Sequence, residues 1–545
     1  MTDFLSILPT LILASLTSIG RVWITILFSI VSGWFLAWAS IKSKVFENTY
    51  ISLSEVFESV PVFSFLPIVF IFFVYDIGGS LGIELAVLFL VFTATVWNIW
   101  MGIYQAFKTV PHDLIEVAEN YKLGFWGKML KLYIPYSIPR IASELMSSFS
   151  DGLFYITVSE VFSVGTRNFE VFGIGSVIAN LTQEGNYLGA LEGVAVIGIF
   201  VAVITYLLRE FAKYSVSKYG LDTEMIVRKK GRLNIRSSLR VTNSLPTFTK
   251  IARVFPTLDK LRRSSTEDYY EEPHKREKLW KIVGGTIAVV LLVLIIYGAV
   301  GIIISVPSTE WAQLISSIPV DLVAIGVDYL RVGIITGVSF LLAVFLGYYL
   351  ATHERVEKVV IPVIQSFAAL PAPAYFPLVY LVTLPLVHEV FGPFTNEFYV
   401  LFIGFISTFY YVFYSFWLGV KNMPTQYWEI MKNYQLGFFE KMRSIVLPST
   451  LPYIVTGLSS TINSAWGGLA IAEFWPNIIN GHNLYVRTGM MRDIVYYTNV
   501  GDIADAAWLS FLFGIIVVLY SILFTRKLMD LSRQKYVAEE GIYLA

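Results

Sequence analysis

The chain has 545 residues, of which 56% are hydrophobic and only 15% are charged, and its 40 Lys and Arg residues balance 40 Asp and Glu residues. Soluble domains carry about 25% charged residues, so this composition and a mean hydropathy of +0.65 exclude an ordinary soluble protein and indicate a polytopic membrane protein. The lack of cysteine excludes disulfides, thiolate metal sites and a cysteine nucleophile, and five histidines leave little for metal chemistry.

Apolar stretches of about 20 residues predict membrane-spanning helices. In chain order they are 17–40, 62–76, 82–107, 141–163 and 189–209, and then, after a polar stretch, 282–305, 328–352, 362–386, 397–420, 453–475 and 506–525. The sequence therefore predicts an all-α membrane protein with about 11 transmembrane helices. Prolines interrupt 62–76 and make its boundaries the least certain of the first set.

Basic residues predict which loops face the cytoplasm. From Arg209 to Lys281 the chain holds 18 Lys and Arg residues against 9 Asp and Glu residues, and the short loops at Lys42, Lys108 and Lys421 alternate to the same side. Positively charged loops remain inside, so this side is cytoplasmic. An odd number of spans then places the N-terminus outside and the C-terminus in the cytoplasm of a multi-pass plasma-membrane protein.

An internal repeat relates two of these loops. Residues 116–140 and 429–453 are identical at 10 of 25 positions with a constant offset of 313. Six predicted spans separate the two copies, so both lie on the same face, and the chain is predicted to contain two parallel repeats with a shared pathway at their interface. The predicted divisions are a first unit over 1–210, a basic cytoplasmic linker over 211–279 and a second unit over 280–545.

Each copy of the loop predicts two short amphipathic helices at the cytoplasmic mouth. Gly124 and Gly437 offer the positive φ that a helix C-terminus often requires. Four prolines suit the first turn of the helix that re-enters the bilayer: Pro135, Pro139, Pro448 and Pro452. Two matched loops favour a docking surface for a partner over helices that only rest on lipid headgroups.

These loops resemble the EAA loop of the permeases of binding-protein-dependent ABC transporters, whose pattern places Glu-Ala-Ala ahead of a glycine and a later Ile-x-Leu-Pro. The resemblance covers 111–139 and 424–452, through Glu116-Val117-Ala118 and Glu429-Ile430-Met431 and the prolines that follow. Lys122 and Gln435 stand where the pattern has glycine. The chain is most similar to permeases of the nitrate, sulfonate and taurine type, and to the duplicated permease component assigned to anion ABC transporters.

The resemblance implies the type I importer permease fold and import of a small anionic solute by alternating access. Two copies of a cytoplasmic ABC ATPase subunit would bind ATP and Mg²⁺ and dock on the loops, and an extracytoplasmic solute-binding protein would deliver the solute. The chain itself has no phosphate-loop motif, so it is predicted to be no enzyme, with no cofactor, metal or nucleic acid. The implied ATPase contacts are Glu116, Val117, Ala118, Tyr121 and Gly124 in the first copy, and Glu429, Ile430, Met431, Tyr434 and Gly437 in the second.

Charged residues in or near the spans are candidates for the pathway or for contact with the binding protein. They are Arg21, Arg331, Glu160, Glu473, Arg487 and Arg492. An oxyanion pathway favours arginine, because guanidinium binds planar oxyanions through paired hydrogen bonds. The two glutamates are therefore better explained as structural, and Asp151 and Asn463 are expected only to pack helices.

Two other functions remain open. A secondary transporter or channel is the chief alternative because parallel repeats occur there as well, although no ionisable residue lies mid-span in both copies. A membrane-embedded enzyme would need a His or Asp constellation at repeat-related positions, which the sequence lacks.

Overall fold

The computed structural model describes residues 2–59, 62–65, 69–164, 167–219, 307–479, 481–520, 523 and 527. The first unit contains α1 (Thr2–Lys42), α2 (Lys44–Ser59), η1 (Val62–Phe65), η2 (Phe70–Ile77), α4 (Gly79–Lys108), α5 (His112–Asn120), α6 (Phe125–Lys128), η3 (Met129–Tyr133), α7 (Ile134–Ser159), β1 (Val161–Val164), β2 (Arg167–Glu170), α8 (Ile174–Gln183) and α9 (Tyr187–Tyr219).

The second unit repeats this order. It contains α15 (Ser308–Leu342), η4 (Ala343–Gly347), α16 (Tyr348–Thr352), α17 (Glu354–Ala369), α18 (Ala372–Phe391), η5 (Gly392–Phe394), α19 (Thr395–Lys421), α20 (Thr425–Asn433), α21 (Phe438–Lys441), η6 (Met442–Val446), α22 (Leu447–Ser449), α23 (Leu451–Ala472), β3 (Phe474–Ile479), β4 (His482–Tyr485), α24 (Met490–Val500) and α25 (Ile503–Tyr520). The predicted all-α class is confirmed, with one short antiparallel hairpin after α7 and one after α23.

Six helical segments of the described residues are long and apolar enough to cross a membrane, or seven if the bent pair Phe438–Ser449 and Leu451–Ala472 forms one span. The predicted span 282–305 lies outside the described residues. The predicted span 62–76 is wrong as a single helix: its described parts are the 3₁₀ helix η1 and the π-helix η2. The sequence has prolines at 61 and 67, which lack the amide N–H that a continuous helix needs.

Two further boundaries differ from the sequence prediction. The predicted span 362–386 is broken between α17 and α18, where Leu370 is extended (φ −75°, ψ 125°); the proline that follows disfavours the helical conformation there. Helix α9 continues to Tyr219, past the predicted end of the first unit at 210. The rest of the predicted linker lies outside the described residues.

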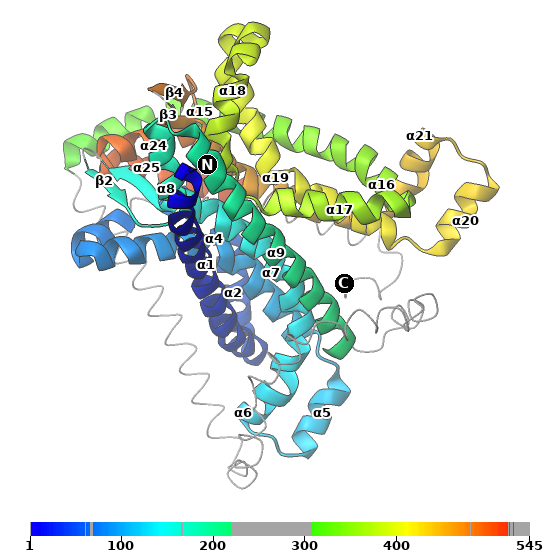
Figure 1. Cartoon of the computed structure of the whole chain (residues 1–545). Coiled ribbons are helices and arrows are strands. Elements are labelled where there is room, and N and C mark those ends of the chain that lie inside the picture. The colour runs from blue at the N-terminus through cyan, green and yellow to red at the C-terminus, as the bar shows by residue number, and fades with distance from the viewer. Residues whose placement is uncertain are drawn as a thin grey trace.

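The two units point the same way and exchange helices. Each hairpin contacts the short helix that follows the other hairpin, β1 with α24 and β3 with α8. Figure 1 places the hairpins at the upper left, and α5–α6 and α20–α21 away from them at the bottom and the right. Helices α17 and α18 pack on α7 and α9 of the first unit, while α2 and η1 pack on α25 of the second. The repeats are therefore parallel and interlocked, with α4, α7, α19 and α23 next to the interface.

Candidate functional site

Helices α5 and α20 are matching surface helices of nine residues each. Val117 in α5 and Ile430 in α20 are 49% and 41% exposed, and the residues that directly follow the two helices, Tyr121 and Tyr434, are 74% and 75% exposed. Glu116 is exposed as well and lies 3.1 Å from His112, one turn earlier on α5. Glu429 is also exposed. These side chains are free to meet a partner surface.

Ala118 and Met431 require a correction, since both were expected to contact the ATPase. They are only 4% and 2% exposed, and Met431 belongs to the apolar cluster around α19 and η6. Their side chains face the protein itself, as the inward positions of an amphipathic helix must. They anchor the helices to the protein, and the exposed face of each helix is formed by their neighbours.

The turn after each helix also differs from the sequence prediction. Gly124 and Gly437 have φ of −68° and −66° and begin the next helix, so they do not supply the positive φ. Lys122 (φ 50°) and Gln435 (φ 49°) take the left-handed conformation instead. The structure therefore retains the turn at the position where the EAA pattern has glycine.

Backbone hydrogen bonds explain why two non-glycine residues accept this conformation. The Leu123 N–H donates to Ala118 O (3.0 Å) and the Lys122 N–H to Glu119 O (2.8 Å). Equivalent bonds link Leu436 to Met431 O and Gln435 to Lys432 O, both at 3.2 Å. This pattern is the Schellman motif, which satisfies the last carbonyl groups of a helix. In it, the N–H of the residue after the left-handed residue donates a hydrogen bond to the carbonyl of the third-last helical residue. The buried Ala118 and Met431 occupy that third-last position.

The prolines after the turn act differently in the two units. Pro135 is near the start of α7, and Pro448 and Pro452 are near the starts of α22 and α23, as predicted. Pro139 lies inside α7, so the prediction that it begins a helix is wrong. The helical segments on either side of Thr450 are bent by 78°, whereas helical conformation is continuous from Phe125 to Ser159.

At the opposite end of the first unit, the candidate residues Arg21 and Glu160 form one buried cluster. Arg21 is 7% exposed and Glu160 is fully buried. The guanidinium donates to Glu84 (2.5 Å) and Glu160 (3.1 Å) and to Phe172 O (2.8 Å). Glu160 also accepts bonds from the Ser18 hydroxyl (2.5 Å) and from the Gly175 N–H (2.8 Å) at the start of α8.

The second unit repeats the cluster with one more carboxylate. Arg331 pairs with Glu397 (2.7 Å), Glu473 (2.9 Å) and Asp328 (2.9 Å). Asp328, which the repeat places opposite Ser18, accepts the N–H groups of Met490 and Met491 at the start of α24 (2.8 and 3.1 Å). Each cluster therefore joins the first long helix of its unit to the N-terminus of the helix after the hairpin.

Glycines at two positions allow these carboxylates to approach so closely. A Cβ on Gly173 would lie 2.0 Å from Glu160 Oε1, and a Cβ on Gly489 would lie 2.2 Å from Glu473 Oε2. Sequence reasoning missed Glu84 and Glu397, although the offset of 313 pairs them. Arg21 and Arg331 are therefore paired with the buried Glu160 and Glu473 and are themselves little exposed.

Arg487 and Arg492 both follow the second hairpin, but they differ in exposure and in their contacts. Arg487 is exposed after β4. Arg492 pairs with Asp493 (2.8 Å), and its backbone N–H donates to Glu473 Oε2 (3.0 Å). Of the two, only Arg487 presents its side chain openly at the hairpin end.

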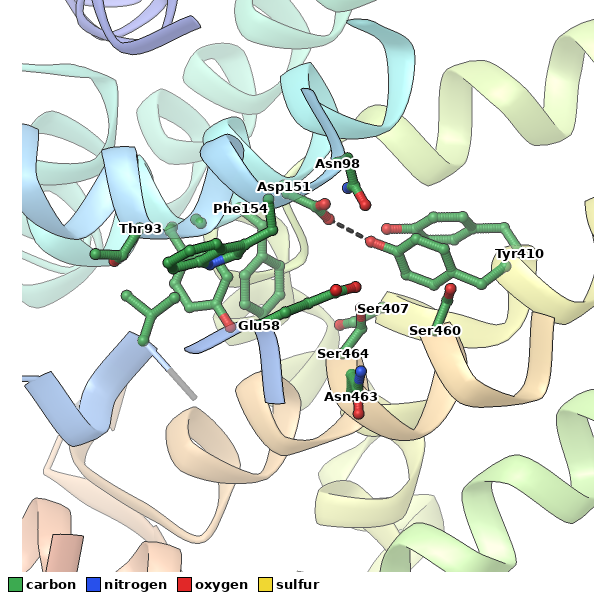
Figure 2. Close-up of a pocket in the computed structure, with 15 residues that line it drawn as sticks. Glu58, Thr93, Asn98, Asp151, Phe154, Ser407, Tyr410, Ser460, Asn463 and Ser464 are labelled. Carbon is green, nitrogen blue, oxygen red and sulfur yellow. Dashed lines mark hydrogen bonds between the residues drawn. The ribbon is translucent and has the colours of Figure 1, made fainter. Parts of the chain in front are cut away.

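A polar cavity of about 90 Å³ lies between the two units (Figure 2). Its lining residues are Glu58, Val62, Thr93, Ala94, Trp97, Asn98, Asp151, Phe154, Tyr155, Ser407, Tyr410, Tyr411, Ser460, Asn463 and Ser464. Tyr411 donates a hydrogen bond to Asp151 Oδ1. The repeat places Asp151 opposite Ser464, so the cavity has different chemistry on its two sides. Asp151 and Asn463, expected only to pack helices, line the space between the repeats.

The chain thus has two parallel, interlocked helical units, a polar cavity between them and a matched pair of exposed helices. This is the architecture of a membrane permease. A family model described as "Binding-protein-dependent transport system inner membrane component" matches residues 26–220 and 340–537, which is more than half of the chain. The chain therefore belongs to this family, and it is a duplicated permease subunit of an ABC importer. No curated protein matches it.

Proposed function

We propose that this chain forms the complete membrane pathway of its importer and that two ATPase subunits drive it through α5–α6 and α20–α21. The observation that carries the proposal is the pair of exposed helices on parallel units, each ended by the same left-handed turn at a non-glycine residue. A pair of identical grooves, one on each ATPase subunit, would fit such a pair.

Motion at the docking surface would reach the cavity through α7 and α23. In the first unit helical conformation runs unbroken from Phe125 past Asp151 to the buried cluster at Glu160. In the second unit the 78° bend at Thr450 separates the docking helices from α23. Closure of the ATPase dimer on ATP and Mg²⁺ would bring α5 and α20 together and change the access of the cavity from one side of the membrane to the other.

The proposal includes an orientation and partners. The end with α5 and α20 faces the cytoplasm, and the hairpin end, with the exposed Arg487, faces an extracytoplasmic solute-binding protein. This orientation follows the positively charged loops and places the N-terminus outside the plasma membrane. The resemblance to nitrate, sulfonate and taurine permeases favours a solute that carries an anionic group.

The test is charge reversal at both docking helices, Glu116→Lys with Glu429→Lys, in the chain co-expressed with its ATPase. We expect ATP hydrolysis to become independent of transport, because each substitution puts a lysine ammonium where the ATPase would contact a glutamate carboxylate. Glu354→Lys is the matched control, since Glu354 is an exposed glutamate (75% of its side chain) outside both loops. Normal coupled hydrolysis in the double variant would refute the docking role, and failure to copurify any ATPase would favour a secondary transporter or channel.

A further inference from the structure

We propose that the cavity between the units receives the positively charged group of its solute, a protonated amine or a similar cation. The proposal rests on the permease function above and names the class of solute. It admits a zwitterion that carries an amino group together with an acid group, and it excludes simple anions such as nitrate.

The charges around the cavity all have one sign. Asp151 and Glu58 are its two ionisable carboxylates, and none of the described lining residues is Lys, Arg or His. The arginines expected to serve an oxyanion, Arg21 and Arg331, are held in the buried clusters at the hairpin end. An ionised carboxylate in the lining repels an anion and attracts a cation, and both effects increase as the effective dielectric constant falls below that of water.

Asp151 is only partly satisfied by the described residues. Among them it accepts one hydrogen bond, from Tyr411, and makes no ion pair. A carboxylate that only packs helices is normally satisfied by several donors, because its burial is costly without them. The clusters at Glu160 and Glu473 show how this chain satisfies such a group, with an arginine and a helix N-terminus in each case.

The remaining walls suit a small organic cation. Trp97, Phe154 and Tyr410 contribute aromatic side chains to the lining, and the faces of aromatic rings attract cations. The Ser407 hydroxyl is buried and makes no hydrogen bond to any described residue, so it is available to the solute. A volume of about 90 Å³ is several times the ~10–15 Å³ that a cavity needs to hold one water molecule, so it has room for a cationic group with its first carbons.

The chain contains no cysteine, so one introduced thiol can report the electrostatic preference of the cavity. Ser460→Cys places the thiol in the lining, and His482→Cys places one on the exposed second hairpin as a control. The assembled transporter, with its ATPase and in membranes, is treated with two methanethiosulfonates of similar size, one carrying trimethylammonium and one carrying sulfonate. Their labelling rates are compared with their rates on a free thiol.

We expect the cationic reagent to be favoured over the sulfonate reagent at Ser460→Cys by about a hundredfold. A unit charge at about 6 Å should speed the first about tenfold and slow the second about tenfold when the effective dielectric constant lies between those of a protein surface and of water. Adding Asp151→Asn should remove most of that preference, and His482→Cys should show the free-thiol ratio. Excess ethanolamine should slow the labelling, whereas excess ethanesulfonate should not. Equal or faster labelling by the sulfonate reagent, a preference that survives Asp151→Asn, or no labelling of the cavity thiol under turnover would overturn the proposal. None of these results affects coupling to the ATPase, which the charge reversals of α5 and α20 test separately.

Discussion

Replacing Arg331 with methionine removes the one cation that three carboxylates share. Two of them, Asp328 and Glu473, have side chains that are 0% exposed, while that of Glu397 is 37% exposed. Arg21→Met removes the matching cation of the first unit but leaves a single fully buried carboxylate, Glu160. The two variants therefore compare one and two unpaired buried charges in closely similar surroundings.

The expected cost follows from these contacts. Breaking a buried ion pair by removing one partner destabilises a protein by about 3–5 kcal/mol. Arg21→Met should lie at the lower end, because Glu160 retains the Ser18 hydroxyl and the Gly175 N–H. Arg331→Met should lie at or above the upper end, because two fully buried carboxyl groups, Asp328 and Glu473, lose the same guanidinium.

Unfolding of the purified chain by a denaturing detergent measures both free energies. The double variant Arg331→Met with Asp328→Ser gives the second unit the serine that the first has at this position, and it should recover part of the loss. Equal costs for the two arginine variants, a loss below about 1 kcal/mol for either, or no recovery in the double variant would refute this account of the clusters.

Two further predictions concern backbone positions. Gly489→Ala should destabilise the chain by about 1–3 kcal/mol, as overpacking does, because the new methyl group would meet Glu473. Gly326→Ala is the control and should be harmless, since a Cβ there has nothing within 4 Å. Equal unfolding free energies for the two variants would contradict the close approach of Glu473 to Gly489. Lys122→Gly and Gln435→Gly should each stabilise the turn by about 0.5–1 kcal/mol, because a side chain disfavours the left-handed conformation. Slower amide exchange at the following leucine would show this, and faster exchange would contradict it.

The docking loops were the part of the molecule that the sequence predicted best. Helices α5 and α20 have bounds that differ by the same offset of 313 that relates their sequences, because similar amphipathic segments next to similar turns form the same local structure. The left-handed residue was misplaced onto Gly124 and Gly437, since glycine is the usual residue there. In the folded chain the Schellman hydrogen bonds decide the position instead.

The buried clusters and the cavity could not be predicted to the same extent. Arg21 meets Glu160 across 139 residues of chain, and Arg331 meets Glu473 across 142. Such pairs depend on how the long helices cross, which a single sequence does not determine. The cavity likewise depends on tertiary packing, because its lining comes from segments of both units that lie far apart in the sequence, from Glu58 to Ser464.

The cavity also shows what fusing two copies into one chain permits. In a dimer of identical subunits, every residue near the symmetry axis occurs twice, so an aspartate at this depth would face a second aspartate and the two charges would oppose each other. Here one unit carries Asp151 and the other carries Ser464. A single chain can therefore place a carboxylate on one side of the cavity opposite an uncharged residue on the other, and alter either half of the lining without altering the other.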